Sequence, residues 1–208
     1  MATADPITGT LALATGLAWA SGINLYAALL VVGLLAANGA IPLPPDLQVL
    51  AHPWVIGAAA TMYLAEFLAD KVPGVDSVWD SLHTLIRIPA GAVLAAGAIG
   101  EVDPAVTAVA ALVGGTVSAG AHALKAGTRI LVNASPEPFS NWALSIGEDA
   151  AVLAGLWIAV THPWLFLVCL GLFVLACLCL LPLLWRGIRH LVRRLTGLFG
   201  PAARPPSL

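Results

Sequence analysis

Residues 66–87 read E-F-L-A-D-K-V-P-G-V-D-S-V-W-D-S-L-H-T-L-I-R and place seven ionisable side chains in one short segment. Glu66 and Asp70 lie four residues apart, on one face of a helix, and Pro73-Gly74 then interrupts that helix. After the break, ionisable residues follow at spacings of four, three and four: Asp76, Asp80, His83 and Arg87. At roughly 100° per residue these four fall within an arc of about 60°, so they form a polar stripe. The opposite face is apolar and carries Val78, Leu82, Leu85 and Ile86.

The chain around this segment is strongly apolar. Of its 208 residues, 60% are hydrophobic and 10% are charged, with a mean hydropathy of +0.94. Soluble domains have roughly 45–50% apolar and 25% charged residues. The composition therefore excludes a soluble globular domain, a disordered chain, collagen and a nucleic-acid-binding protein. It predicts an all-α, polytopic helical membrane protein whose surroundings are the lipid bilayer.

The apolar residues fall into about six membrane-embedded segments, with five or seven also open. A helix needs about 20 apolar residues to span the hydrocarbon core. Four stretches meet or approach this length: residues 7–37, 53–69, 106–132 and 164–185. Residues 88–100 and 144–160 are shorter, but each continues a polar helical segment. The connections at 38–52, 101–104, 134–141 and 161–163 are too short for a second domain, so we expect one integral membrane domain over residues 1–185.

The tail after residue 185 is basic. It holds five of the nine Lys and Arg residues of the chain: Arg186, Arg189, Arg193, Arg194 and Arg204. By the positive-inside rule, residues 186–208 form a cytoplasmic tail, either an amphipathic helix on anionic lipid or a plain stop-transfer flank. No Lys or Arg precedes the first apolar stretch, so we expect no cleaved signal peptide.

Two motifs suggest an internal duplication. His52-Pro53-Trp54 recurs as His162-Pro163-Trp164. At a constant offset of 98 residues, Gly16, Ala20, Gly22 and Asn24 also align with Gly114, Ser118, Gly120 and His122. Two halves of three segments each, 7–100 and 104–185, would have opposite orientations and form an inverted repeat with broken helices at the midplane. Small-residue helix packing explains the same glycines without duplication.

Two further polar stripes accompany the first. One lies within an arc of about 80° and consists of His122, Lys125, Arg129 and Asn133; the other consists of Asn141, Ser145 and Glu148, with Asp149 beside it. A charged side chain at membrane depth costs on the order of 2.5–3.5 kcal/mol, so three such stripes indicate a shared polar interior. The candidate substrate- or ion-binding residues are Glu66, Asp70, Asp76, Asp80, His83, Arg87, Lys125, Arg129, Glu148 and Asp149.

Acidic residues outnumber basic ones in this polar set. The seven acids are Glu66, Asp70, Asp76, Asp80, Glu137, Glu148 and Asp149, and the four bases are Lys71, Arg87, Lys125 and Arg129. Protonation or a bound cation would compensate the surplus of three. Oxygen ligands suit hard divalent ions, so Glu66, Asp70, Asp76 and Asp80 are the candidate metal ligands. The three cysteines, Cys169, Cys177 and Cys179, share one apolar run and are interpreted as packing residues.

Four motifs carry polar residues within the apolar chain: S-G-I-N-L-Y at 21–26, E-F-L-A-D-K-V-P-G-V-D-S-V-W-D at 66–80, H-T-L-I-R-I-P-A-G-A at 83–92 and N-A-S-P-E-P-F-S-N-W at 133–142. In these motifs the chain, over about residues 10 to 165, resembles an uncharacterised bacterial membrane family, domain of unknown function 4126. It implies a multi-pass protein of the bacterial inner membrane. It implies no activity, substrate or site residues.

Three functions are compatible with the stripes. The first is a small transporter or channel for a cation, or one coupled to protons, with the acidic cluster as its site and a small ion or molecule as substrate. The second is a membrane-embedded enzyme or carrier for a phosphorylated lipid, in which Arg87, Lys125 and Arg129 hold the phosphate while carboxylates bind Mg²⁺ or act as acid and base. The third is a structural subunit held together by ion pairs.

Geometry separates these three functions. A water-accessible cavity lined by unpaired carboxylates favours transport, whereas carboxylates and arginines beneath a lipid-sized groove favour the second function. Closed ion pairs without a cavity favour the third. The sequence contains no H-E-x-x-H, G-x-S-x-G or phosphate-loop motif, so it names no catalytic residue. Association into a homo-oligomer is compatible with all three.

Overall fold

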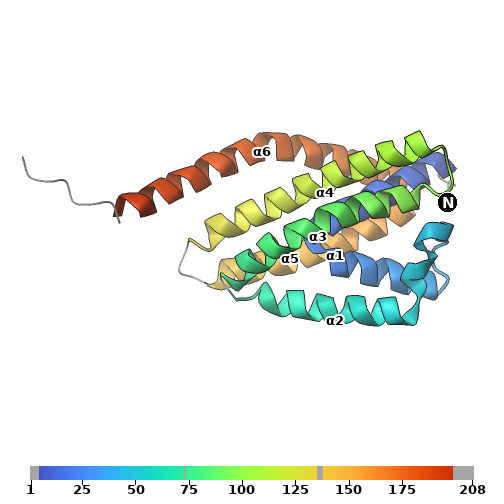
Figure 1. Ribbon diagram of the computed structural model, residues 1–208, viewed down its shortest axis with the longest axis horizontal. Coiled ribbons are helices and arrows are strands. Elements are labelled where there is room, and N and C mark those ends of the chain that lie inside the picture. Colours follow the sequence, from blue (N-terminus) through green and yellow to red (C-terminus); the bar gives the residue numbers. More distant parts are fainter. Residues whose placement is uncertain (1–4, 73, 135–137, 199–208) are drawn as a thin grey trace, which may run out of the picture.

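The structure, a computed structural model, describes residues 5–72, 74–134 and 138–198. Within these ranges the chain forms six α-helices, one short 3₁₀ helix and no strand (Figure 1). The helices are α1 (Pro6–Ala37), η1 (Pro45–Ala51), α2 (Pro53–Ala69), α3 (Val75–Ala98), α4 (Pro104–Val132), α5 (Pro138–Thr161) and α6 (Pro163–Leu198). This confirms the all-α class, and the two short apolar segments are indeed the continuations of polar helices, in α3 and α5.

Prolines start most of these helices. Five of the six described α-helices begin at a proline: Pro6, Pro53, Pro104, Pro138 and Pro163. The fixed φ of proline suits the first turn, where a missing N–H costs nothing. Asp103 adds a side-chain cap, because its carboxylate accepts the N–H of Ala105 at 2.7 Å.

Five of the described helices are long and apolar enough to cross a membrane: α1, α3, α4, α5 and α6. The pair η1 and α2, bent by 66°, passes the same test as one unit, which gives up to six. The connections between consecutive helices from α2 to α6 are short, so these five helices run alternately up and down the bundle (Figure 1). The N-terminal end of the bundle is the end at which α2, α4 and α6 begin, and the C-terminal end is the one at which they finish.

Helix α1 does not run through the bundle but turns back on itself at Asn24. Asn24 has non-helical dihedral angles, φ −145° and ψ 95°. Before the break, Gly16 lies beside Ala159 at the end of α5; after the break, Gly33 lies against the carbonyl oxygen of Leu50 in η1. Both contacts are at the N-terminal end, where both ends of α1 therefore lie (Figure 1). The first predicted segment is thus a re-entrant hairpin with its tip inside the bundle.

This turn corrects the predicted inverted repeat. Because α1 returns to its starting end, the first half of the chain has two full-length helices and the second half has three. The matched segments consequently run in the same direction: the first part of α1 is parallel to α4, and α2 is parallel to α6. His52 and His162 both precede helices that begin at the N-terminal end. Among the described helices α1 has an internal break, at Asn24, and the matched segments of the two halves are parallel rather than inverted.

Small residues let α1, α3 and α4 approach closely. A Cβ atom on Gly22 would lie 2.3 Å from the carbonyl oxygen of Ser118, and one on Gly114 would lie 2.3 Å from the Cβ of Ala95. The hydroxyls of Ser21 and Ser118 both donate to the carbonyl oxygen of Arg87, at 2.8 Å and 2.9 Å. The regions around Gly22 and Ser118 therefore pack closely through their small residues.

The outer surface of the described bundle is apolar. The side of α3 opposite its polar stripe is exposed, as predicted, with Val78, Leu82, Leu85 and Ile86 between 46% and 82% accessible. The four tryptophans near helix ends, which sequence position suggests as interface anchors, are also exposed: Trp54, Trp142, Trp164 and Trp185. An apolar exterior around a polar interior is the arrangement that a bilayer requires.

Candidate functional site

Eight of the ten predicted site residues meet in one buried network of ion pairs. They are Glu66, Asp70, Asp76, Asp80, Arg87, Lys125, Arg129 and Glu148. They come from four helices, because α2 and its C-terminal turn, α3, α4 and α5 each turn a polar face inward. The network lies between the tip of α1 and the C-terminal end of the bundle.

Arg87 forms the part of the network nearest the middle of α3. Its guanidinium donates to Glu66 Oε1 at 2.6 Å and to Asp80 Oδ1 at 2.8 Å, and all three side chains are at most 1% exposed. It also donates to Nδ1 of His122 at 3.2 Å, while Nε2 of His122 is 2.6 Å from the hydroxyl of Thr84. His122 therefore acts toward Arg87 as a neutral acceptor.

Lys125 occupies the centre of the network. Its ammonium nitrogen lies 3.3 Å from both Glu66 Oε1 and Asp70 Oδ2, and 3.5–3.6 Å from oxygens of Glu148 and Asp80. Its shortest contact is to a backbone group, the carbonyl oxygen of Ile23 at 2.9 Å. That carbonyl precedes the break at Asn24, where the end of a helical segment carries partial negative charge.

Arg129 ties the network to the turn between α2 and α3. It donates to the carboxylate of Asp70 at 3.0 Å and to the backbone oxygen of Asp70 at 3.1 Å. It also pairs with Glu148 and, at 3.5 Å, with Asp76. Asp76 is largely structural, because its Oδ1 accepts the backbone N–H groups of Gly74 and Ser77 at the start of α3.

Negative charge exceeds positive charge in this network. Five carboxylates face three cations, which leaves a surplus of two if every acid is ionised. One oxygen of each of three carboxylates is buried without a hydrogen-bond partner: Glu66 Oε2, Asp70 Oδ1 and Asp80 Oδ2. Buried polar atoms are rarely left unpaired, so these oxygens are positions where a water, a proton or a cation would be stabilised.

His83 and Asp149 lie beside the network rather than in it. His83 stacks on Trp79 with ring centroids 4.4 Å apart, and its Nε2 is 3.1 Å from the hydroxyl of Tyr26. Asp149 accepts from Asn24 at 2.9 Å and from Tyr63 at 3.3 Å. Of the other members of the predicted charge set, Lys71 sits 3.3 Å above the Phe67 ring, and Glu137 is outside the described residues.

The carboxylates do not converge as metal ligands. Among the described residues, no group of three or more His, Cys, Asp or Glu side chains is arranged to hold a metal ion. Glu66, Asp70, Asp76 and Asp80 instead surround Arg and Lys side chains. A metal bound by these four carboxylates stays a prediction.

The sequence suggested that the break at Pro73-Gly74 would contribute to the site, but the break that supplies a backbone carbonyl to the network is at Asn24. The turn after α2 does free backbone carbonyls, but protein donors take them: Arg129 and Asn141 donate to Asp70, and Trp142 donates to Lys71. The break at Asn24 supplies the Ile23 carbonyl. In the sequence this break is marked by Asn24, which follows Ser21 and Gly22 within a long apolar run. Such a pattern is equally typical of a continuous helix whose small residues pack against a neighbouring helix.

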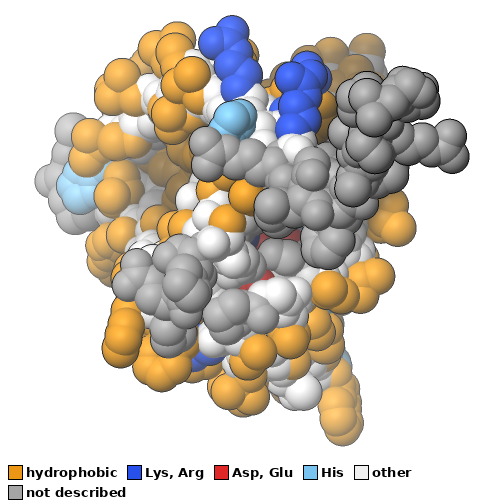
Figure 2. Space-filling model, turned by 90° about the vertical axis from the view of Figure 1, so that its left-hand side faces the viewer, with side chains coloured by type: hydrophobic (Ala, Val, Ile, Leu, Met, Phe, Trp, Pro, Cys, Tyr) orange, Lys and Arg blue, Asp and Glu red, His pale blue; other side chains and the backbone are white. Residues whose placement is uncertain are grey.

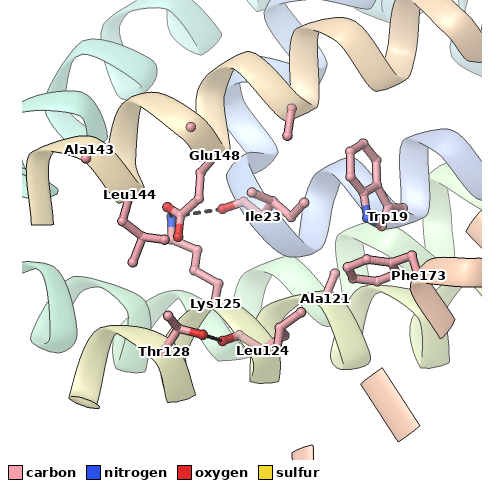
Figure 3. Close-up of a pocket in the computed structure, with 12 residues that line it drawn as sticks. Trp19, Ile23, Ala121, Leu124, Lys125, Thr128, Ala143, Leu144, Glu148 and Phe173 are labelled. Atoms are coloured by element: carbon pink, nitrogen blue, oxygen red, sulfur yellow. Dashed lines mark hydrogen bonds and ion pairs between the residues drawn. The ribbon is translucent and has the colours of Figure 1, made fainter. Parts of the chain in front are cut away.

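A groove in the side of the bundle reaches the network (Figure 3). It has a volume of about 390 Å³ and is lined by residues of α1, α4, α5 and α6. Glu148 and Lys125 lie at its polar end, while Trp19 and Phe173 lie at the other end. Viewed along the bundle from the C-terminal end, acidic atoms are also visible near the middle of the surface (Figure 2).

Comparison with known proteins gives a family and no function. No curated protein and no solved structure shows a significant match to the chain. The sequence model of the family described as domain of unknown function (DUF4126) matches residues 11–183, which include every residue of the network. The chain therefore belongs to the DUF4126 family.

Proposed function

We propose that this protein is a transporter that moves a cation across the bacterial inner membrane in exchange for protons. The observation that carries the proposal is the surplus of buried carboxylates beside a helix that breaks at membrane depth. Discontinuous helices whose ends face charged groups are typical of ion-coupled transporters. A proton and a cation would compete for the same carboxylate oxygens, so binding of one releases the other.

The ends of the broken helix support this role. The carbonyl of Ile23, at the end of the first part of α1, faces the ammonium of Lys125. Asn24 caps the second part, because its Oδ1 accepts the N–H of Ala27 at 2.9 Å, and its amide faces the carboxylate of Asp149. A change of charge on Lys125 therefore acts directly on one end of the break, and a change of charge on Asp149 acts on the other.

The charge balance disfavours a phosphate site. Each of the three cations already contacts at least two carboxylates. A phosphate would add negative charge to a cluster that already has a surplus of it. A purely structural role is disfavoured by the unpartnered carboxylate oxygens and by the groove that reaches Glu148.

The distribution of charge supports a cytoplasmic C-terminal end. The connections at the N-terminal end of the bundle contain Asp46, Glu101 and Asp103 but no Lys or Arg. At the other end, Lys71 precedes α3, and the last part of α6 carries Arg186, Arg189, Arg193 and Arg194. By the positive-inside rule, this distribution favours a cytoplasmic C-terminal end, with the network in the cytoplasmic half of the bilayer.

Proton flux in liposomes tests the proposal. Purified protein would be reconstituted with a pH-sensitive dye inside, and gradients of Na⁺, K⁺, ammonium and tetraphenylphosphonium would be imposed in turn. We expect at least one cation to drive proton movement that protein-free liposomes lack. Glu148→Gln should abolish it, since Glu148 is the least buried network carboxylate at 12% exposure and its replacement keeps the side-chain shape.

Glu101→Gln is the matched control, because Glu101 is exposed in the connection before α4, far from the network. It should transport like the wild type. Absence of cation-driven proton flux in the wild type, or equal flux in the wild type and Glu148→Gln, would overturn the proposal. Size-exclusion profiles would establish that both variants are folded.

A further inference from the structure

The groove beside Glu148 suggests what kind of cation the protein accepts. We propose that it receives a lipophilic organic cation, which enters sideways from the bilayer between α4 and α5 and places its positive charge at Glu148. This inference rests on the proposed cation transport and names its substrate class. The volume of about 390 Å³ is within the range of roughly 300–1,000 Å³ common for small-molecule pockets.

The walls of the groove suit an apolar molecule. Leu124 and Ala121 of α4 form one side, and Leu144 and Ala151 of α5 form the other. Ala143, Gly147 and Ala151 follow at intervals of one helical turn on α5, are exposed, and leave the groove open on that side. Since the outside of the bundle faces lipid, a molecule dissolved in the bilayer reaches these walls without crossing water.

The polar end of the groove favours a positive charge. The Glu148 side chain is 12% exposed, whereas the Lys125 side chain is 2% exposed and has oxygens of four acidic residues around its nitrogen. Glu148 itself pairs with Arg129 and Lys125, and the network that these three residues share has two carboxylates more than cations. Trp19 and Phe173 supply aromatic faces at the other end, and such faces also attract organic cations. An anion of the same shape would meet the surplus of carboxylates.

A pair of ions of nearly equal shape and opposite charge tests this inference. Tetraphenylphosphonium and tetraphenylborate would each be titrated into protein in neutral detergent, with thermal stability and tryptophan fluorescence as readouts. We expect saturable stabilisation by tetraphenylphosphonium alone, because a ligand that binds the folded state raises the Tm. Glu148→Gln should lose the response. Equal responses to both ions, or no saturable response to tetraphenylphosphonium, would overturn the inference.

Gly147→Leu fills the groove without disturbing the fold. No atom lies within 4 Å of a Cβ built on Gly147, so the leucine side chain extends into open space. Gly171→Leu is the matched control, since Gly171 is exposed on α6, has equal space and does not line the groove. Gly147→Leu should lose tetraphenylphosphonium binding and Gly171→Leu should keep it. Undiminished binding in Gly147→Leu would refute the groove as the site.

Failure of this inference is distinguishable from failure of the transport proposal. Proton flux driven by Na⁺, K⁺ or ammonium together with no groove-dependent tetraphenylphosphonium binding would leave transport standing and refute the substrate class. Groove-dependent binding without proton flux for any cation would support the lipophilic-cation site and refute exchange transport.

Discussion

The ammonium of Lys125 donates to the carbonyl oxygen of Ile23 at 2.9 Å, so the most connected cation of the network also holds the tip of the re-entrant helix α1. Four carboxylates surround the same nitrogen, and Lys125 is 5% exposed as a residue. The charge network and the helix break are thus one structural unit, and a change in either should be measurable in the other.

Loss of the Lys125 charge should destabilise the protein strongly. Lys125→Met leaves the carboxylates with one cation fewer and the Ile23 carbonyl without its donor. Breaking a buried ion pair from one side costs about 3–5 kcal/mol, so we expect a large drop in folded yield and in the Tm in detergent. Lys125→Met with Asp80→Asn should recover part of the loss. A Tm of Lys125→Met equal to that of the wild type would contradict the assigned central role.

An exchange of partners should reveal the bond between Asn24 and Asp149. Asn24→Asp places two carboxylates 2.9 Å apart and should lower the Tm. Adding Asp149→Asn restores one amide and one carboxylate with their positions exchanged, and an aspartate can still cap the N–H of Ala27. We expect the double variant to be more stable than Asn24→Asp, with a coupling energy of about 0.5–3 kcal/mol. Additive effects in thermal unfolding would mean that the two side chains do not interact.

Two glycine-to-alanine changes should have opposite effects on stability. Gly22→Ala forces a Cβ to within 2.3 Å of the Ser118 carbonyl oxygen and 2.8 Å of the Ala121 Cβ, so α1 and α4 must separate. Overpacking of this kind costs about 1–3 kcal/mol. Gly120→Ala meets no atom within 4 Å and should be neutral or stabilising by up to about 1 kcal/mol, because alanine favours a helix more than glycine does. Thermal unfolding of both variants, measured in one detergent, provides the comparison.

The re-entrant turn of α1 makes a prediction about topology. Single cysteines in place of Asp5, Asn38 and Glu101, in a chain whose three native cysteines are replaced by serine, should react with an impermeant maleimide from the same side of the membrane. A cysteine in place of His190 should react only from the opposite side, which we expect to be the cytoplasm. Labelling of Asp5→Cys and Asn38→Cys from opposite sides would mean that α1 crosses the bilayer.

Periodicity and composition alone predicted much of this protein. The spacing of Asp76, Asp80 and Arg87 put them on one face of α3, and the opposite face of that helix is exposed as expected. Lys125 and Arg129 likewise share one face of α4. The physical reason is that a helix repeats every 3.6 residues and that charges at membrane depth must face each other, so spacing alone indicates which side chains point inward.

Only the tertiary structure decided where α1 turns, which acid pairs with which base, and that the matched segments are parallel. The turn in α1 requires non-helical dihedral angles at Asn24 alone, and the rest of the segment is as apolar as a membrane span. Hydropathy therefore cannot distinguish a helix that spans the membrane from a helical hairpin. Partner choice, such as Arg87 with Glu66 and Asp80, depends on the rotation and depth of several helices to within about an ångström. The groove exists because α4 and α5 stand apart beside Glu148, and that separation results from the packing of all their neighbours.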